Sequence, residues 1–387
     1  MLPSSPPTQA SQHVTSTRPT QPAQISFLDK YIPLWIILAM LLGLILGRTV
    51  PDLSGLMSSM EIGGISLPIA LGLLVMMYPP LAKVRYDKTR QIASNRQLMG
   101  VSLILNWVVG PAFMFILAWL FLPDAPELRT GLIIVGLARC IAMVLVWSDM
   151  SCGDREATAV LVALNSLFQV AMFGFLGWFY LQVLPSWLGL EVTSVEFSVW
   201  AIVSSVLVFL GVPLLAGILS RIIGEKIKGR GWYESSFLPA ISPLALIGLL
   251  YTIVLLFSLQ GEQITSQPWT VARLAIPLSL YFVGMFAVAL IAARASKLTY
   301  SQSASVAFTA AGNNFELAIA VSIGTFGAAS AQALAGTIGP LLEIPILVGL
   351  VYFMRGIGPK LFPGDTTLPP TIGSAEKSEP SQTSYSL

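Results

Sequence analysis

Residues 303–324 read SASVAFTAAGNNFELAIAVSIG, an apolar segment long enough to cross a bilayer, interrupted near its middle by Gly312-Asn313-Asn314 and then Glu316. A Gly-Asn-Asn run is a poor helix former. At membrane depth it would leave backbone groups unpaired unless it lines a cavity or packs against protein. We therefore expect a membrane helix that is broken at its centre, with a carboxyl group beside the break.

A second apolar segment, residues 131–147, carries polar groups at a similar depth. It reads GLIIVGLARCIAMVLVW, with Arg139 and Cys140 near its middle. A charged group at the bilayer centre costs roughly 2.5–3.5 kcal/mol on insertion scales, so such groups are retained where they pair or function. In a purely structural interpretation, Arg139 and Glu316 form an ion pair that only joins two helices. In the functional interpretation, which we favour, the two breaks form a binding site.

The composition indicates an all-α integral membrane protein. Hydrophobic residues make up 55% of 387 and charged residues 10%, whereas a soluble domain carries roughly 25% charged residues. The net charge of +2 is too small to predict nucleic-acid binding. The single histidine, His13, lies in a polar N-terminal segment, which excludes a histidine-based metal site inside the membrane. We find no phosphate-loop motif and predict no cofactor.

Ten apolar windows are long enough to cross a bilayer. They lie near residues 31–50, 65–82, 98–122, 130–148, 156–183, 198–220, 237–259, 271–292, 302–327 and 331–354. With both termini inside, all Lys and Arg residues except Arg48, Arg129, Arg139 and Arg273 fall in cytoplasmic segments. The positive-inside rule therefore predicts a multi-pass protein with both termini in the cytoplasm. Polar segments 1–26 and 361–387 are expected to be disordered tails.

Five spans per half predict an inverted repeat, residues 27–190 and 191–360. A shift of 176 residues places Gly72-Leu73-Leu74 on Gly248-Leu249-Leu250 and Gly136 on Gly312. The same shift pairs the fourth and ninth spans, which are the two with polar interruptions. Transporters built from inverted repeats place their substrate site at such a pair of broken helices.

Other polar residues accompany the two breaks. Glu343 in the tenth span is a further buried acid that we expect to face the crossing, and Asn165 and Gln169 in the fifth span offer supporting oxygens. Together these groups could hold a proton or a Na⁺ ion. A cation next to Cys140 would favour the thiolate, a soft ligand. Cys152 lies in a predicted cytoplasmic loop, where we expect no role.

Three stretches resemble a known family: residues 136–170 around GLARCIAM, residues 310–320 (AAGNNFELAIA) and residues 339–351 (GPLLEIPILVGLV). They look like the arsenical-resistance efflux permeases of the bile acid/arsenite/riboflavin transporter superfamily, and the resemblance covers roughly residues 27–360. It implies a panel domain and a core domain, with the fourth and ninth helices discontinuous and crossed. It also implies export of arsenite, sometimes antimonite, across the cell membrane in exchange for protons.

The resemblance further implies roles for residues of the site. The family's essential cysteine corresponds to Cys140 and its essential glutamate to Glu316. We therefore expect Cys140, Arg139, Asn313, Asn314 and Glu316 to bind substrate, with Glu316 and Glu343 carrying protons. The expected partners are arsenite, antimonite, protons and membrane lipid. An accessory ATPase is neither predicted nor excluded.

Other functions remain open from the sequence. A Na⁺-coupled symporter of organic anions would need an oxygen-rich ion cage and a roomy apolar cavity, and would have no use for Cys140. An intramembrane enzyme would need a base, but no histidine lies in a span, and we expect no enzymatic activity. A sensor would bind its ligand without any flux.

Overall fold

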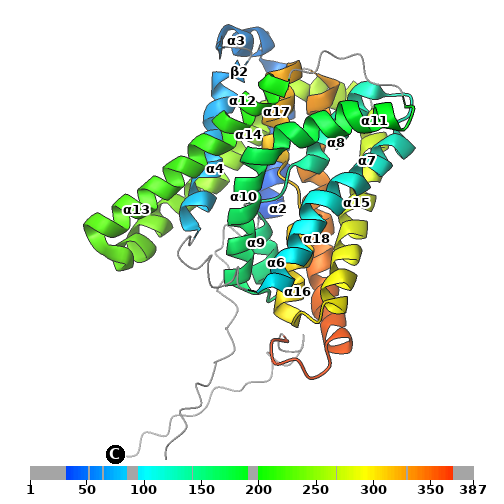
Figure 1. Ribbon diagram of the computed structural model, residues 1–387. Coiled ribbons are helices and arrows are strands. Elements are labelled where there is room, and N and C mark those ends of the chain that lie inside the picture. Colours follow the sequence, from blue (N-terminus) through cyan, green and yellow to red (C-terminus); the bar gives the residue numbers. More distant parts are fainter. Residues whose placement is uncertain are drawn as a thin grey trace, which may run out of the picture.

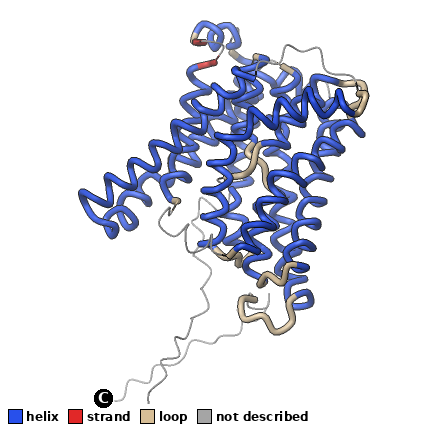
Figure 2. Tube along the Cα trace, viewed as in Figure 1, coloured by secondary structure: helices blue, strands red, loops and turns tan. Residues whose placement is uncertain are grey.

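The computed structural model describes residues 32–50, 53–62, 65–84, 95–141, 143–190, 199–266, 268–327 and 330–368, and the statements below concern these residues. They form a bundle of helices with one short antiparallel strand pair, in which Ile62 is opposite Ile65 (Figures 1 and 2). The elements of the first half are α2 (Ile32–Thr49), α3 (Leu53–Ser59), β1 (Glu61–Ile62), β2 (Ile65–Ser66), α4 (Leu67–Lys83), α6 (Arg96–Ile104), η1 (Leu105–Val109), α7 (Gly110–Phe121), α8 (Pro126–Leu137), α9 (Met143–Met150), α10 (Arg155–Trp178), η2 (Phe179–Val183) and α11 (Leu184–Trp187). Those of the second half are α12 (Val199–Val206), η3 (Leu207–Gly211), α13 (Val212–Trp232), η4 (Tyr233–Phe237), α14 (Leu238–Ser266), α15 (Pro268–Ala295), α16 (Tyr300–Ala311), α17 (Phe315–Phe326) and α18 (Ala331–Leu361).

Each of the ten expected apolar windows coincides with a helix or a run of consecutive helices. Five helical segments of the described chain are long and apolar enough to cross a membrane: Arg96–Phe121, Arg155–Trp187, Ile202–Leu259, Pro268–Ala295 and Ala331–Leu361. The segment Ile202–Leu259 reverses direction near Gly229, whose φ of 84° is one that L side chains rarely adopt. The predicted helical membrane protein is therefore confirmed, with the sixth window extended as far as Trp232.

Four π-helical turns, η1 to η4, have a common cause in the sequence. Each ends two residues before a proline, namely Pro111, Pro185, Pro213 and Pro239. A proline ring clashes with the carbonyl four residues earlier in a regular helix. In each case the residue before the proline donates its N–H to the carbonyl five residues back, which widens the turn. The helices therefore accommodate these prolines without ending.

The helices pack in two sets. Helices α2, α4, α13 and α14 contact mainly one another, whereas α7, α8, α15, α16, α17 and α18 form the second set. Within the first set, α4 and α14 approach closely where Gly248 lies against Gly72, because a Cβ on Gly248 would come within 3.0 Å of the Gly72 carbonyl oxygen. Small residues permit such close contacts between membrane helices.

The C-terminal end of the described chain is bound to the bundle. The Asp365 carboxylate accepts from the Tyr300 N–H (2.7 Å) and the Thr367 hydroxyl from the Ser301 N–H (3.2 Å), so both cap the N-terminus of α16. Residues 361–368, which we expected to belong to a disordered tail, are therefore ordered. The expectations for residues 1–26 and 369–387 lie outside the described residues.

Candidate functional site

Two interrupted helices cross in the middle of the bundle. Helix α8 ends at Leu137 and α9 begins at Met143, while α16 ends at Ala311 and α17 begins at Phe315 (Figure 2). The extended residues between them pair as antiparallel strands, since Cys140 N–H donates to the Gly312 carbonyl (3.4 Å) and Asn314 N–H to the Ala138 carbonyl (3.0 Å). The expected breaks in the fourth and ninth windows thus satisfy each other's backbone groups.

The two asparagines hold this crossing together. The Asn313 side chain donates to the carbonyls of Val135 (2.8 Å) and Ala138 (3.2 Å) at the end of α8. The Asn314 side chain accepts from the Leu317 N–H (3.0 Å) and so caps α17. One polar atom of each, Asn313 Oδ1 and Asn314 Nδ2, is buried without a hydrogen-bond partner. Both residues therefore have structural contacts and an unused polar atom.

Gln169 of α10 occupies the other edge of the extended segment. Its Oε1 accepts from the Arg139 N–H (2.9 Å), and its Nε2 donates to the Arg139 carbonyl (3.0 Å). A neighbouring β-strand would make the same pair of bonds. Residues 138–140 are thus held on both edges, by residues 312–314 on one side and by the Gln169 carboxamide on the other.

The Arg139 side chain is completely buried and bonds to uncharged groups. Its Nη1 donates to the Tyr281 hydroxyl (2.7 Å) and to the Ala310 carbonyl (3.5 Å), and its Nη2 donates to the Gly136 carbonyl. The salt bridges of the described residues include none between Arg139 and Glu316. The ion pair considered as the structural interpretation is therefore not formed.

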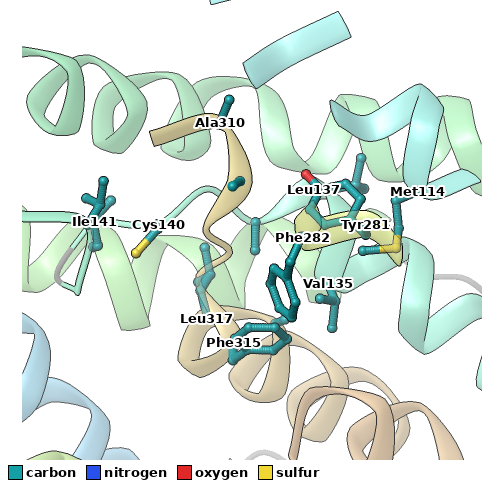
Figure 3. Packing of buried hydrophobic residues seen from close by; sticks show 14 of the residues in the cluster. Met114, Val135, Leu137, Cys140, Ile141, Tyr281, Phe282, Ala310, Phe315 and Leu317 are labelled. Atoms are coloured by element: carbon teal, nitrogen blue, oxygen red, sulfur yellow. The ribbon is translucent and has the colours of Figure 1, made fainter. Parts of the chain in front are cut away.

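Cys140 lies on a different side of the crossing from Tyr281, the partner of Arg139. Figure 3 shows the two residues on either side of the segment that runs from Ala310 to Leu317. Successive side chains of an extended segment point in opposite directions, which separates the Arg139 and Cys140 side chains. The expectation that the Arg139 cation faces the thiol is corrected accordingly. Cys140 is buried, with 3% of the residue exposed.

Gly312 brings Cys140 and Glu343 together. A Cβ on Gly312 would lie 3.0 Å from the Cys140 Cβ and 3.2 Å from Glu343 Oε1. Glu343 is buried, its Oε1 has no hydrogen-bond partner, and it lies close enough to Glu316 for the two carboxyls to interact electrostatically. The structure thus places Cys140 and Glu343 side by side at Gly312, with Glu316 within electrostatic range of Glu343.

Glu316 lines a pocket of about 20 Å³ between the two helix sets. Its walls come from α2, α14, α17 and α18, and its polar lining groups besides Glu316 are Thr252 and Thr337. A volume of roughly 10–15 Å³ is needed for one water. In this conformation the pocket therefore has room for little more than one such molecule.

Asn165 lies one helical turn before Gln169. Its Oδ1 accepts from the Trp107 indole N–H (3.2 Å), and its Nδ2 is buried without a partner. Trp107 lies on the π-turn η1 that precedes Pro111. Of the two expected supporting residues, Gln169 therefore contacts the crossing, and Asn165 contacts the third apolar segment.

Cys152 is half-buried, with a φ of 59° at the α9–α10 connection. Burial raises the pKa of its thiol and the nearby Asp149 raises it further, although Arg355 opposes the shift. It lies apart from the crossing, because the connection is joined to the N-terminus of α16 by the Tyr300 hydroxyl, which donates to the Ser151 carbonyl (2.9 Å).

Two contributors were not predicted from the sequence. Tyr281 and Gly110 surround the Arg139 guanidinium: a Cβ on Gly110 would lie 2.6 Å from Arg139 Nη1. A tyrosine in the middle of an apolar span was a usable signal, since its hydroxyl needs a partner there. Gly110 gave no comparable signal.

Comparison with known proteins places the chain among transporters. Residues 70–267 match the model of the Sodium Bile acid symporter family. The chain is 79% identical over 363 residues to the arsenical-resistance protein Acr3 of Corynebacterium glutamicum, a match that covers 94% of this chain and 98% of the relative.

Two more distant relatives match most of the chain as well. An uncharacterized transporter of Synechocystis sp. is 35% identical over 84% of this chain and 88% of its own length. The arsenical-resistance protein Acr3 of Alkaliphilus metalliredigens is 30% identical over 84% of this chain and 92% of its own length.

Proposed function

The chain belongs to the arsenical-resistance permeases within the Sodium Bile acid symporter family, and from that premise we propose that it exports trivalent arsenite from the cytoplasm across the cell membrane. Antimonite is the second candidate substrate. The observation that carries the proposal is the 79% identity to an arsenical-resistance protein over 94% of the chain. We propose that the protein is a transporter and not an enzyme.

The proposed architecture is ten membrane spans in two inverted repeats, residues 27–190 and 191–360. Gly72 and Gly248, which the 176-residue shift relates, contact each other. The half-helices α8 and α16, related by the same shift, each have 12 residues and both end at the crossing. Contact between equivalent residues supports a pseudo-two-fold axis, and the two helix sets correspond to a panel and a core.

Cys140 is the proposed arsenite ligand. Arsenite at neutral pH is an uncharged trihydroxide of a thiophilic element, so a soft sulfur donor suits it. One thiol with polar neighbours allows release, whereas three thiols would trap the metalloid. Only Cys140 of the two cysteines lies at the crossing, with Glu343 and Gly312 beside it. Asn313 and Asn314 contribute the unused polar atoms described above.

Glu316 and Glu343 are the proposed proton carriers. A neutral solute cannot be driven outward by voltage, whereas a counter-transported proton gains about 2.3 kcal/mol per 100 mV. Two carboxyls close together and shielded from water disfavour a state in which both are charged. When the Cys140 S–As bond forms, one As–O bond breaks and the hydroxide leaves as water with the thiol proton. The two carboxyls can share a further proton, and its release to the cytoplasm on arsenite binding couples the two fluxes.

Transport requires the buried site to open. Cys140 is buried, with 3% of the residue exposed, so arsenite reaches its thiol only after a rearrangement. The pocket at Glu316 lies where the two helix sets meet. A movement of one set relative to the other would open the site at this boundary. Differential binding of proton and arsenite would shift such an equilibrium. The distribution of Lys and Arg supports cytoplasmic termini.

A Na⁺-coupled symporter of organic anions is the less favoured alternative. It gives Cys140 no role in transport.

Proteoliposomes test the proposal directly. Purified protein should release trapped arsenite when a pH gradient is imposed, and the flux should collapse with a protonophore. Replacing external Na⁺ by N-methylglucamine should leave the flux unchanged. Absence of arsenite flux under a verified pH gradient would contradict the proposal, and Na⁺-dependent uptake of an organic anion would favour the alternative.

A further inference from the structure

Two half-helices, α8 and α16, end at the crossing with their carbonyl ends. A helix C-terminus carries roughly half a negative charge on its unsatisfied carbonyls. In transporters with broken helices, such ends and the unwound carbonyls beside them coordinate the coupling cation. The crossing therefore contains an arrangement suited to binding a cation, and Na⁺ is the cation expected in that role.

In this protein a side chain, the Arg139 guanidinium, occupies the position between the two helix C-termini. The Arg139 guanidinium donates to Gly136 in the last turn of α8 and to Ala310 in the last turn of α16 (3.5 Å). Two C-termini of roughly half a charge each balance one guanidinium. No carboxylate of the described residues lies within salt-bridge distance of it. The helix ends thus supply the counter-charge that a buried cation needs.

The groups around Arg139 pack closely against its guanidinium. Its side chain is completely buried, the Tyr281 hydroxyl is bonded to Nη1 at 2.7 Å, and a methyl group on Gly110 would collide with Nη1. The cation is therefore held tightly by α8, α15 and α16 together.

We propose that Arg139 is a tethered cation that replaces a coupling Na⁺ at the C-termini of the two half-helices. It is a positioning residue for the crossing, and it makes the protein independent of Na⁺. The inference bears on the coupling ion of the proposed function. The inference is argued from contacts within the chain, and its main test measures the melting temperature. The result therefore does not depend on whether the protein transports arsenite.

The first test needs no variant. The melting temperature of the purified full chain in detergent should be the same in NaCl as in N-methylglucamine chloride at equal ionic strength. A Na⁺-specific rise in the melting temperature would overturn the inference, because it would reveal an open Na⁺ site.

The second test removes the Arg139 guanidinium. Arg139→Ala should lower the melting temperature by several degrees, and millimolar guanidinium or Na⁺ should restore part of the loss in a saturable manner. The control Arg221→Ala removes another buried guanidinium, which is bonded to Glu225 (2.6 Å) and lies away from the crossing. It should show no such rescue.

If Arg139→Ala does not accumulate as folded protein, Arg139→Lys keeps a charge at the position and should fold, while Arg139→Met should not. Equal stability of Arg139→Met and Arg139→Lys would contradict the inference. So would an Arg139→Ala protein that is as stable as wild type or that neither cation rescues.

Discussion

Gly312 lies against Cys140 so closely that a methyl group on the glycine would come within 3.0 Å of the cysteine Cβ and 3.2 Å of Glu343 Oε1. Gly312 has a φ of −76°, which any residue can adopt, so the position requires space and not backbone freedom. The contact joins the ninth apolar segment to the fourth at the proposed arsenite ligand.

Gly312→Ala should therefore impair arsenite export. The added methyl group forces Cys140 and Glu343 apart, and overpacking of this kind costs about 1–3 kcal/mol. We expect a lower melting temperature and a reduced flux in proteoliposomes. Gly100→Ala is the control, because a Cβ added there meets nothing within 4 Å apart from the backbone of its own helix. This variant should gain up to about 1 kcal/mol from helix propensity. An unaffected Gly312→Ala protein would contradict the close packing.

Cys140→Ser should abolish arsenite flux, and Cys152→Ser should leave it near the wild-type level. A hydroxyl is too hard a donor for a thiophilic centre. With Cys140 as the only cysteine, arsenite should slow alkylation by a membrane-permeant maleimide. With Cys152 alone, alkylation should be slow at neutral pH whether or not arsenite is present, because burial raises the pKa of that thiol. Wild-type export by Cys140→Ala would refute the thiol mechanism.

Glu316→Gln should remove the dependence of arsenite flux on the pH gradient while the protein remains folded. The amide keeps the shape of the side chain but cannot exchange a proton. Glu343→Gln should have a similar effect if the two carboxyls share one proton, and the double variant should be no worse than either single one. If Glu316→Gln keeps the wild-type pH dependence, Glu343 alone is the carrier.

Gln169→Met should destabilise the crossing. The change preserves side-chain volume but leaves the buried N–H and C=O of Arg139 unpaired, at about 1–3 kcal/mol for each group. We expect faster alkylation of Cys140 in a Cys152→Ser background, together with reduced flux. Ser166→Ala is the control on the same helix, because among the described residues the Ser166 hydroxyl bonds to the Val162 carbonyl of its own helix (2.9 Å) and to no other group. Equal alkylation rates in both variants would count against the Gln169 contacts.

Asp365→Asn should weaken the cap of α16. Burial alone would raise the pKa of Asp365, but hydrogen bonds from the Thr367 hydroxyl, the Thr367 N–H and the Tyr300 N–H outweigh it and lower the pKa. The stabilisation is therefore complete above the unfolded pKa of about 3.9 and is lost as pH falls through the lower folded value. Caps contribute about 0.5–2 kcal/mol, and this partly exposed carboxylate belongs at the lower end. The melting temperatures of Asp365→Asn and wild type should differ at pH 7 and converge below pH 4.

The amino-acid sequence by itself determined the class of the protein and the places where its helices break. Long apolar runs have one stable environment, and polar groups in the middle of such runs mark interruptions because lipid cannot satisfy them. Gly312-Asn313-Asn314 and Arg139-Cys140 therefore indicated the crossing before any contact was known. The four π-turns also follow from local chemistry, since each is set by a proline two residues later.

Only the tertiary structure decided which group faces which at the crossing. The Arg139 side chain turns to Tyr281, 142 residues away along the chain, and not to Glu316, while Gln169 binds the Arg139 backbone. Side chains of an extended segment alternate between two faces, so a shift of one residue in the pairing would exchange the positions of Arg139 and Cys140. That register depends on backbone bonds between the fourth and ninth segments. Composition and periodicity do not encode it, because it arises from the packing of segments far apart in sequence.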